Sequence, residues 1–293
     1  MKIGFIGAGK MGFTLGRHLR LYEDIFKKDE RISYHVEGYY SQSKESARNA
    51  AEFTDTNYYE SLEELVKNCD ALILTVPDGQ IEAVAKTLQE FGNLMNDKII
   101  CHTSGALSSQ IFSGMDNSYG YSIHPIYAVS SKTESYKNFK ECFITIEGHD
   151  KYIDIIRCIF ETIGHKVKVI SKNDKVKYHS GAVFASNLIV GLYEMSTDIL
   201  TQCGFSVEEA NIALKPLFKN NADRVFEAGP ENALTGPVER CDIVTVSKHV
   251  DALEGTELEV YKLLSRKLVE IARRKNSHKD NQDKYSDLLK ILN

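Results

Sequence analysis

The chain has 293 residues, of which 42% are hydrophobic and 26% charged, and its formal net charge at pH 7 is -5. That length allows two domains with a sizeable core, and the acidic balance argues against a nucleic-acid surface and favours a small-molecule partner. No apolar run approaches the roughly 20 residues that span a bilayer, and residues 1–19 lack the features of a signal peptide, so we expect a cytoplasmic protein outside the membrane. The six cysteines show neither a C-x-x-C pair nor zinc-ligand spacing, so we expect reduced thiols and no metal site.

The chain opens with MKIGFIGAGKMGFTLGRHL, an apolar run followed by Gly7, Gly9 and Gly12 at the spacing G-x-G-x-x-G. In a dinucleotide-binding loop these glycines permit a tight turn, a close approach of the backbone to the pyrophosphate and close packing of the helix. The motif follows a strand and opens a helix, whose N-terminus favours negative charge. It therefore predicts a dinucleotide site, with a bare turn as the alternative. The residues expected in this site are Gly7, Ala8, Gly9, Lys10, Met11 and Gly12.

The end of the second predicted strand favours NADP over NAD. HVEGYY is followed by SQSKES, and no carboxylate precedes Glu45 to hold a ribose 2′-hydroxyl. Ser41, Ser43 and Lys44 instead offer hydroxyls and a cation that suit a 2′-phosphate. An ordinary N-capped helix is the alternative explanation. The strand ALILTV then ends at Val76 and Pro77, which we expect beside the ribose and nicotinamide.

Strand-like and helix-like segments alternate through residue 170, which predicts βαβ units and a mostly parallel sheet. The fold class is thus α/β, with an NADP-binding Rossmann domain over residues 1–170 and an all-helical substrate and dimerisation domain over residues 171–293. KVKYHSGAVFASNLIVGLYEMSTDILTQCG is apolar almost all round, which predicts one long buried helix that stops at Gly204. We expect a second copy of the chain to cover it, as a homodimer.

Polar residues follow two neighbouring strands, His102 and Ser104 in HTSG and His124 in YSIHPIY. The carboxyl ends of adjacent parallel strands converge on one crevice, so these groups are candidates to bind a substrate carboxylate or carbonyl. Histidines that only satisfy a turn are the alternative.

On one continuous helix Lys175, His179 and Asn187 would share a face, and such groups are costly to bury without partners. Lys175 and His179 are therefore competing candidates for the proton donor. A solvated Lys175 at the helix start is the alternative.

The segment ALTGPVERCDIVTVSKH adds Thr235, Arg240 and Asp242 as candidate substrate-binding residues. Arg240 offers a fork that can clamp a carboxylate with two hydrogen bonds. An ion pair between Arg240 and Asp242 that fixes the loop is an equally good structural explanation.

The segments GFIGAGKMG, VPDGQI, HTSGALSS, DKVKYHSGAVFASN and LTGPVERCD together resemble the bacterial Rossmann-like proteins whose helical C-terminal domain was long catalogued as being of unknown function. The resemblance runs from residue 2 to about residue 265. This family is similar to 6-phosphogluconate dehydrogenase, in a group that includes ketopantoate reductase, pyrroline-5-carboxylate reductase and prephenate dehydrogenase.

In that group a lysine and an asparagine of the first long helix contact the substrate, so the resemblance implies these roles for Lys175 and Asn187, with Ser104 as the polar residue after the strand. The usual spacing of four residues between the two is not kept, because residue 179 is histidine, and His179 is then expected to take part of the role. His124 with Pro125 resembles the His-Pro turn of prephenate dehydrogenases.

The combined hypothesis is an NADPH-dependent oxidoreductase that reduces a small 2-oxo acid, with a ketopantoate-like acid as the first substrate. Asn187 and Ser104 would orient the carbonyl, and Arg240 or His124 would hold the carboxylate. A pyrroline-5-carboxylate-type imine reductase is the main alternative and needs a lysine acid less, since an imine already carries its proton. A non-catalytic NADP-binding regulatory protein and a dehydrogenase of prephenate-like acids are the others.

Overall fold

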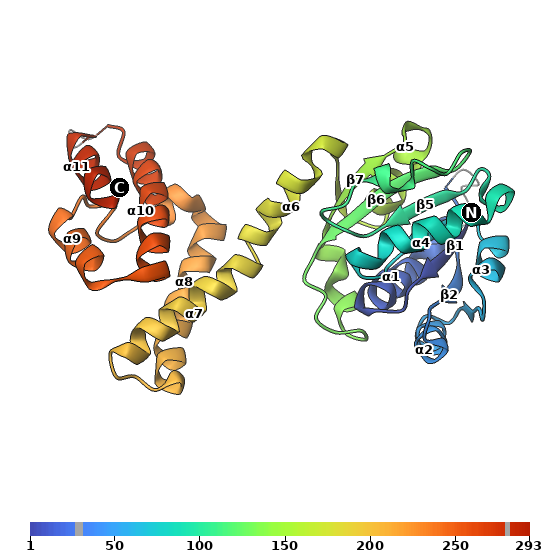
Figure 1. Cartoon of the computed structure of the whole chain (residues 1–293), viewed down its shortest axis with the longest axis horizontal. Helices are drawn as coiled ribbons and strands as arrows, with labels where there is room; N and C mark the ends of the chain where they lie inside the picture. Colours follow the sequence, from blue (N-terminus) through green and yellow to red (C-terminus); the bar gives the residue numbers. More distant parts are fainter. Residues whose placement is uncertain (27–31, 279–281) are drawn as a thin grey trace. The chain divides into compact units, whose positions relative to one another are not determined.

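The chain divides into two compact units, Met1–Ala185 and Ser186–Asn293 (Figure 1). This structure is a computed structural model that describes residues 1–26, 32–278 and 282–293.

The first unit contains an eight-stranded sheet in the order β3-β2-β1-β4-β5-β6-β7-β8. Every neighbouring pair is parallel except β6 and β7, which are antiparallel, so the predicted α/β fold with a mostly parallel sheet is confirmed. The strands are β1 (Lys2–Ile6), β2 (His35–Tyr40), β3 (Asn57–Tyr58), β4 (Ala71–Leu74), β5 (Ile99–His102), β6 (Tyr119–Ile126), β7 (Phe143–Gly148) and β8 (Lys166–Val169). The α-helices are α1 (Lys10–Phe26), α2 (Lys44–Thr54), α3 (Leu62–Asn68), α4 (Asp78–Glu90), α5 (Asp150–Thr162) and α6 (Lys175–Phe184), with 3-10 turns η1 (Gly92–Met95), η2 (Ser109–Phe112), η3 (Ser135–Glu141) and η4 (Lys172–Asp174).

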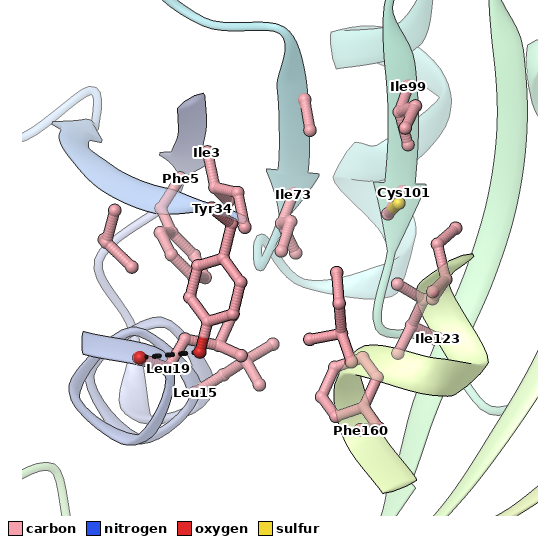
Figure 2. Packing of buried hydrophobic residues seen from close by; sticks show 14 of the residues in the cluster. Ile3, Phe5, Leu15, Leu19, Tyr34, Ile73, Ile99, Cys101, Ile123 and Phe160 are labelled. Atoms are coloured by element: carbon pink, nitrogen blue, oxygen red, sulfur yellow. Dashed lines mark hydrogen bonds between the residues drawn. The ribbon is translucent and has the colours of Figure 1, made fainter. Parts of the chain in front are cut away.

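The central strands are short and apolar because both of their faces are buried. Side chains alternate across a strand, so Phe5 of β1 joins the core beneath α1, α2 and α5, whereas Ile6 joins the core beneath α3 and α4. Figure 2 shows the first of these cores, in which Cys101 packs between strand and helix and the Tyr34 hydroxyl donates to the Leu19 carbonyl at 2.9 Å. Burial raises the pKa of the Cys101 thiol, as expected for a packing residue.

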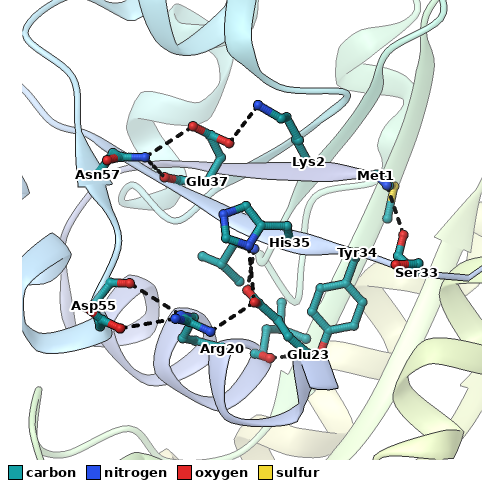
Figure 3. Close-up of polar contacts among 12 residues, drawn as sticks. Met1, Lys2, Arg20, Glu23, Ser33, Tyr34, His35, Glu37, Asp55 and Asn57 are labelled. Atoms are coloured by element: carbon teal, nitrogen blue, oxygen red, sulfur yellow. Dashed lines mark hydrogen bonds and ion pairs between the residues drawn. The ribbon is translucent and has the colours of Figure 1, made fainter. Parts of the chain in front are cut away.

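A polar network fixes β2 against α1. The buried Glu23 carboxylate accepts a hydrogen bond from the Val36 amide at 2.6 Å and pairs with Arg20 at 3.0 Å (Figure 3). Arg20 also reaches Asp55, just after α2, at 3.1 Å. Glu23 and Arg20 thus tie α1 to the start of β2 and to the residue that follows α2.

The second unit is entirely helical over its described residues, which confirms the predicted helical domain. A small core gathers Val246, Val269 and Tyr285 from three of its helices. Helix α8 departs from helical geometry at Gly229, whose φ is +74°. The helices are α7 (Asn187–Gln202), α8 (Val207–Ala233), α9 (Ile243–Ala252), α10 (Gly255–Lys275) and α11 (Gln282–Leu292).

The predicted single long helix is wrong, because the chain leaves helical geometry at Ser186 (φ -133°, ψ -82°), between α6 and α7. At this break the Ser186 hydroxyl donates to the Asn187 side-chain oxygen at 3.1 Å. The prediction that this segment is buried is also wrong for the single chain, in which Val190 is 70% exposed.

The boundary between the units, after residue 185, differs from the boundary at residue 170 that the strand pattern indicates. Helix α6 belongs to the first unit because its first residue, Lys175, bonds to Ser104 of that unit. Among the described residues, no helix is both long and apolar enough to cross a membrane.

Two buried histidines face one another between α1 and the residue before β8. The Nε2 atoms of His18 and His165 are 2.8 Å apart, and His165 Nδ1 lies 2.9 Å from the Cys142 carbonyl. A carbonyl accepts only, so His165 donates through Nδ1 and accepts from His18 through Nε2. Burial lowers the pKa of His18 to about 3 and also lowers the pKa of His165, which favours the neutral form of both rings.

We predict that His18→Gln makes the protein less sensitive to acid. The folded pKa of His18 lies below its ordinary 6.5, so the unfolded state binds the extra proton and stability is lost as the pH falls from 6.5 towards 3. Glutamine keeps a hydrogen-bonding group without titrating, and the slope of unfolding free energy against pH should fall by roughly 1.4 kcal/mol per pH unit in that window. Urea titrations from pH 7 to 4 measure it, with the exposed His278→Gln as control. Equal slopes for wild type and His18→Gln would contradict the prediction.

Candidate functional site

The glycine loop has the local structure that its motif predicts, a tight turn from β1 into α1. Gly7 has a φ of +104°, a conformation that glycine adopts readily. A Cβ at Gly12 would lie 2.6 Å from the Gly7 carbonyl oxygen and 2.7 Å from Thr75 Oγ1, so glycine there permits α1 to pack against the turn. A Cβ at Gly9 would meet no atom nearer than 3.8 Å, which leaves this stretch of backbone accessible.

The loop lies in the wall of a cavity of about 570 Å³ at the carboxyl ends of β1, β2 and β4. Six of the eleven predicted cofactor residues line it, namely Gly7, Ala8, Gly9, Ser41, Val76 and Pro77. The other five predicted residues, Lys10, Met11, Gly12, Ser43 and Lys44, are outside its wall. About half of the residues that the sequence predicts for the cofactor thus lie in one cavity wall, and their role in binding stays a prediction.

The residues outside the wall have structural explanations. Ser43 caps α2 by accepting a hydrogen bond from the Ser46 amide at 3.2 Å, which is the alternative that the sequence left open. Lys44 forms a surface ion pair with Glu60 at 3.1 Å. The cation expected at the end of β2 is thus paired on the surface.

The sequence analysis missed several lining residues, among them Gln42, Thr75 and Lys132. Thr75 Oγ1 donates to the Gly7 carbonyl at 2.8 Å and so fixes the turn. The sequence could have indicated Thr75 as a cavity residue, because it lies at the end of the predicted strand ALILTV. Lys132 comes from the segment between β6 and β7, and no motif marks it.

A second group of side chains surrounds Lys175, the first residue of α6. This lysine is only 2% exposed, and its Nζ donates to the Ser104 carbonyl at 3.0 Å. Burial lowers the pKa of Lys175 to about 8, against the attraction of Glu147 and Asp78, which favours the charged form. A buried lysine with a pKa near neutrality is typical of catalytic lysines.

Ser104 is hydrogen-bonded through both its backbone and its side chain. Its hydroxyl donates to Asp78 at 2.6 Å and accepts from the Leu107 amide at 3.0 Å, while its own amide donates to His102 Nδ1 at 3.2 Å. His102 is buried, its pKa is lowered to about 4 by burial, and its Nε2 has no hydrogen-bond partner within the described parts of the chain. The Ser104 hydroxyl therefore already donates to Asp78, whereas His102 Nε2 is a buried nitrogen without a hydrogen-bond partner among the described residues.

His124 and His179 lie on the other side of the Ser104 turn. His124 Nδ1 is 2.7 Å from the Tyr178 hydroxyl, which accepts from Thr145 at 2.9 Å, and burial lowers the pKa of His124 to about 3. His179 Nδ1 is buried and finds no partner among the described atoms. A Cβ at Gly105 would lie 2.3 Å from this atom, so only glycine lets the two imidazoles meet there.

The remaining predicted substrate residues belong to the second unit. Asn187, Thr235 and Arg240 are exposed, and Asp242 accepts a hydrogen bond from the Thr245 amide at 3.0 Å as the N-cap of α9. The structure thus groups His102, Ser104, His124, Lys175 and His179 in the first unit, whereas the roles of Asn187, Thr235, Arg240 and Asp242 in the second unit stay predictions. The sequence analysis missed Asp78, Thr145, Glu147 and Tyr178 as members, because they reach the group through the fold.

The two candidate sites are joined by adjacent residues. Pro77 lines the cavity, and the next residue, Asp78, accepts the Ser104 hydrogen bond. A buried ammonium, neutral imidazoles and a glycine-lined cavity together suit proton transfer beside a bound anionic cofactor. Over residues 1–26, 32–278 and 282–293, no three His, Cys, Asp or Glu side chains are grouped as metal ligands would be.

We predict that a methyl group destabilises the fold far more at Gly12 than at Gly9. Gly12→Ala places a Cβ against fixed backbone and should destabilise the fold by about 1–3 kcal/mol, as overpacking does. Gly9→Ala has space in the protein and should cost under about 1 kcal/mol, since its methyl projects where no protein atom is close. Urea unfolding of both variants tests this pair, and a larger loss for Gly9→Ala would refute the packing assignment.

Comparison with known proteins supports the two-part organisation. A family model for a Rossmann-like domain matches residues 1–125, and a model for DUF2520, a domain of unknown function, matches residues 142–268. No curated protein matches the chain.

Solved structures share the fold across nearly the whole length. The chain is similar to a protein from Thermotoga maritima, with 26% identity, a TM-score of 0.72 and coverage of 94% of this chain and 99% of that one. A protein from Bacteroides fragilis, described as a candidate NADP oxidoreductase, shows 24% identity and a TM-score of 0.66 over 91% of this chain and 96% of that one. A pyrroline carboxylate reductase from Plasmodium falciparum with NADP bound shows 14% identity and a TM-score of 0.54 over 100% and 98%. The two family models thus match the two parts of the chain, as the resemblance described from the sequence predicts.

Proposed function

We propose that this protein is an NADPH-dependent oxidoreductase that reduces a small 2-oxo acid. The observation that carries the proposal is the buried Lys175 ammonium at the carboxyl ends of the strands. It is linked through Ser104 and Asp78 to the wall of the cavity beside the glycine loop. In an open α/β sheet this edge is where cofactor and substrate bind.

The cavity fits a dinucleotide with a 2′-phosphate. The open side of Gly9 lets a pyrophosphate approach the backbone at the start of α1. Ser41 and Gln42 line the cavity at the end of β2, where NAD-binding loops hold a carboxylate. The named similar proteins from Bacteroides fragilis and Plasmodium falciparum are associated with NADP, which agrees with this choice.

When bound, the reduced nicotinamide supplies the hydride, and this chain supplies the proton. Lys175 is mostly an ammonium at pH 7 because its pKa is about 8, and it is poised to donate to the developing alkoxide. The amine left after donation stays bonded to the Ser104 carbonyl. His179 is the competing donor, and His102 and His124 are neutral hydrogen-bonding groups for the substrate. Asn187, Thr235, Arg240 and Asp242 stay predictions that this proposal does not require.

An imine substrate is the second candidate. The similar structures include pyrroline-5-carboxylate reductases, an imine reductase and a reductive aminase, which favours this class. An iminium carbon accepts hydride without a further proton, so reduction of an imine would survive loss of Lys175. The effect of removing this lysine therefore separates the two candidates.

The exposed apolar side chains of the second unit support the homodimer that the sequence predicts. Phe226 is 85% exposed and Ile212 is 68% exposed, which is unusual for large apolar groups on a monomer. Light scattering should give a mass near twice the 33.0 kDa of one chain. Phe226→Glu should shift the mass towards one chain, and a wild-type mass of 33.0 kDa would contradict the dimer.

The function is tested by titrating the protein with NADPH and following loss of nicotinamide absorbance against a panel of 2-oxo acids and cyclic imino acids. We expect tight NADPH binding and turnover of one 2-oxo acid, with kcat/KM falling as the pH rises through about 8 because Lys175 loses its proton. Binding without any turnover would instead support the regulatory alternative.

Lys175→Met should lower kcat/KM for the 2-oxo acid by about 10²- to 10⁴-fold. The variant should remain folded, because the Ser104 carbonyl still accepts from Ser122 at 3.2 Å. Lys177→Met removes an exposed lysine of the same helix and is the matched control. Unchanged turnover in Lys175→Met would reject Lys175 as the acid and favour an imine substrate if an imino acid is the one reduced.

A further inference from the structure

The cavity beside the glycine loop has a wall that is almost free of charge, and this inference rests on the proposed binding of a dinucleotide there. Among the described residues that line it, Lys132 is the one charged side chain, and none is a carboxylate. The end of β2 and the start of α2 contribute the uncharged side chains of Tyr40, Ser41, Gln42 and Ser46. A doubly charged phosphate at that end would need a cation that β2 and its following turn do not provide.

The cations near the end of β2 in the sequence have other partners. Lys44 pairs with Glu60 at 3.1 Å. Arg48 lies 3.7 Å from the same carboxylate, with its guanidinium carbon 4.8 Å from the centre of the Tyr58 ring. Neither lines the cavity. The positive charge in the wall therefore comes from a distant part of the chain.

Lys132 reaches the cavity from the segment that connects β6 to β7, the two antiparallel strands in Figure 1. Turns built on Ser131 order this segment, since the Ser131 hydroxyl accepts from the Thr133 and Glu134 amides, each at 3.3 Å. The Lys132 ammonium lies 5.1 Å from the centre of the Phe13 ring, on the first turns of α1. No carboxylate pairs with it among the described residues, so its charge is free to meet an anion.

The two kinds of phosphate on an NADP molecule make different demands. The pyrophosphate is served by the backbone amides and dipole at the start of α1. The 2′-phosphate lies at the end of β2, and there the wall offers hydroxyl and amide groups alone. An added cation should strengthen phosphate binding most at the 2′-phosphate, because the start of α1 already supplies positive potential to the pyrophosphate.

We propose that Lys132 binds the 2′-phosphate of the cofactor and is the residue that selects NADPH over NADH. Lys132 already lies in the wall of the same cavity as Ser41 and Gln42, and these three side chains would surround the phosphate. Selection of the cofactor is then made by a residue far along the sequence from the glycine motif.

The test measures dissociation constants of wild type and Lys132→Gln for NADPH, NADH and adenosine 2′,5′-bisphosphate, a probe that carries the 2′-phosphate but no pyrophosphate or nicotinamide. We expect Lys132→Gln to weaken NADPH and the bisphosphate by roughly tenfold, the usual scale for a hydrogen bond to a charged group, and to leave NADH unchanged. Lys137→Gln is the matched control, since Lys137 is an exposed lysine nearby that pairs with Glu134 and does not line the cavity. Lys44→Gln tests the cation that the sequence indicated, and it should change none of the three constants.

The outcomes separate this inference from the proposed function. Equal weakening of NADPH and NADH in Lys132→Gln would place the lysine on the pyrophosphate and overturn the inference, while leaving dinucleotide binding intact. Unchanged constants would mean that Lys132 only packs on Phe13, and would also overturn it. A wild-type protein that binds none of the three probes would reject the proposed function itself, and the inference with it.

Discussion

The hydrogen bond from the buried Lys175 ammonium to the Ser104 carbonyl is the constraint around which the candidate centre is arranged. Ser104 connects four parts of the first unit, namely α6, β6, α4 and β5. Its carbonyl also accepts from Ser122 of β6, its hydroxyl donates to Asp78 of α4, and its amide donates to His102 of β5. Because every polar atom of Ser104 has a partner, the turn after β5 has little freedom, and the lysine is held in one place.

Holding that charge in the interior works against the stability of the fold. The pKa of Lys175 is about 8 instead of 10.5, which corresponds to about 3 kcal/mol that the folded state would gain if the lysine were neutral. Between pH 8 and 10.5 the unfolded state binds more protons than the folded state, so this contribution makes stability rise with pH in that window. A stable fold has no need of such a group, whereas a proton donor near neutral pH does.

The parts of the fold that the sequence predicts are those that depend on neighbouring residues. The strand ALILTV and the spacing of Gly7, Gly9 and Gly12 act over a few positions, so sheet and turn follow from local pattern. The break at Ser186 was missed because apolar periodicity continues through it, while the backbone departs from a helix around one local side-chain hydrogen bond. No sequence motif indicates Lys132, because only the path of the chain after β6 brings this residue to the cavity.

The parallel direction of the strands explains why the cavity and the side chains around Lys175 lie at one edge of the sheet. Strands β1, β4 and β5 run in the same direction, so the glycine turn, Pro77 and Ser104 follow their carboxyl ends in turn. The step from Pro77 in the cavity wall to Asp78 beside Ser104 is a single peptide bond. A shift of α4 would therefore move both groups together, so the sheet and not the surface loops would set the distance between a cofactor in the cavity and Lys175, the proposed proton donor. That arrangement supplies the fixed geometry that transfer of a hydride and a proton to the same substrate requires.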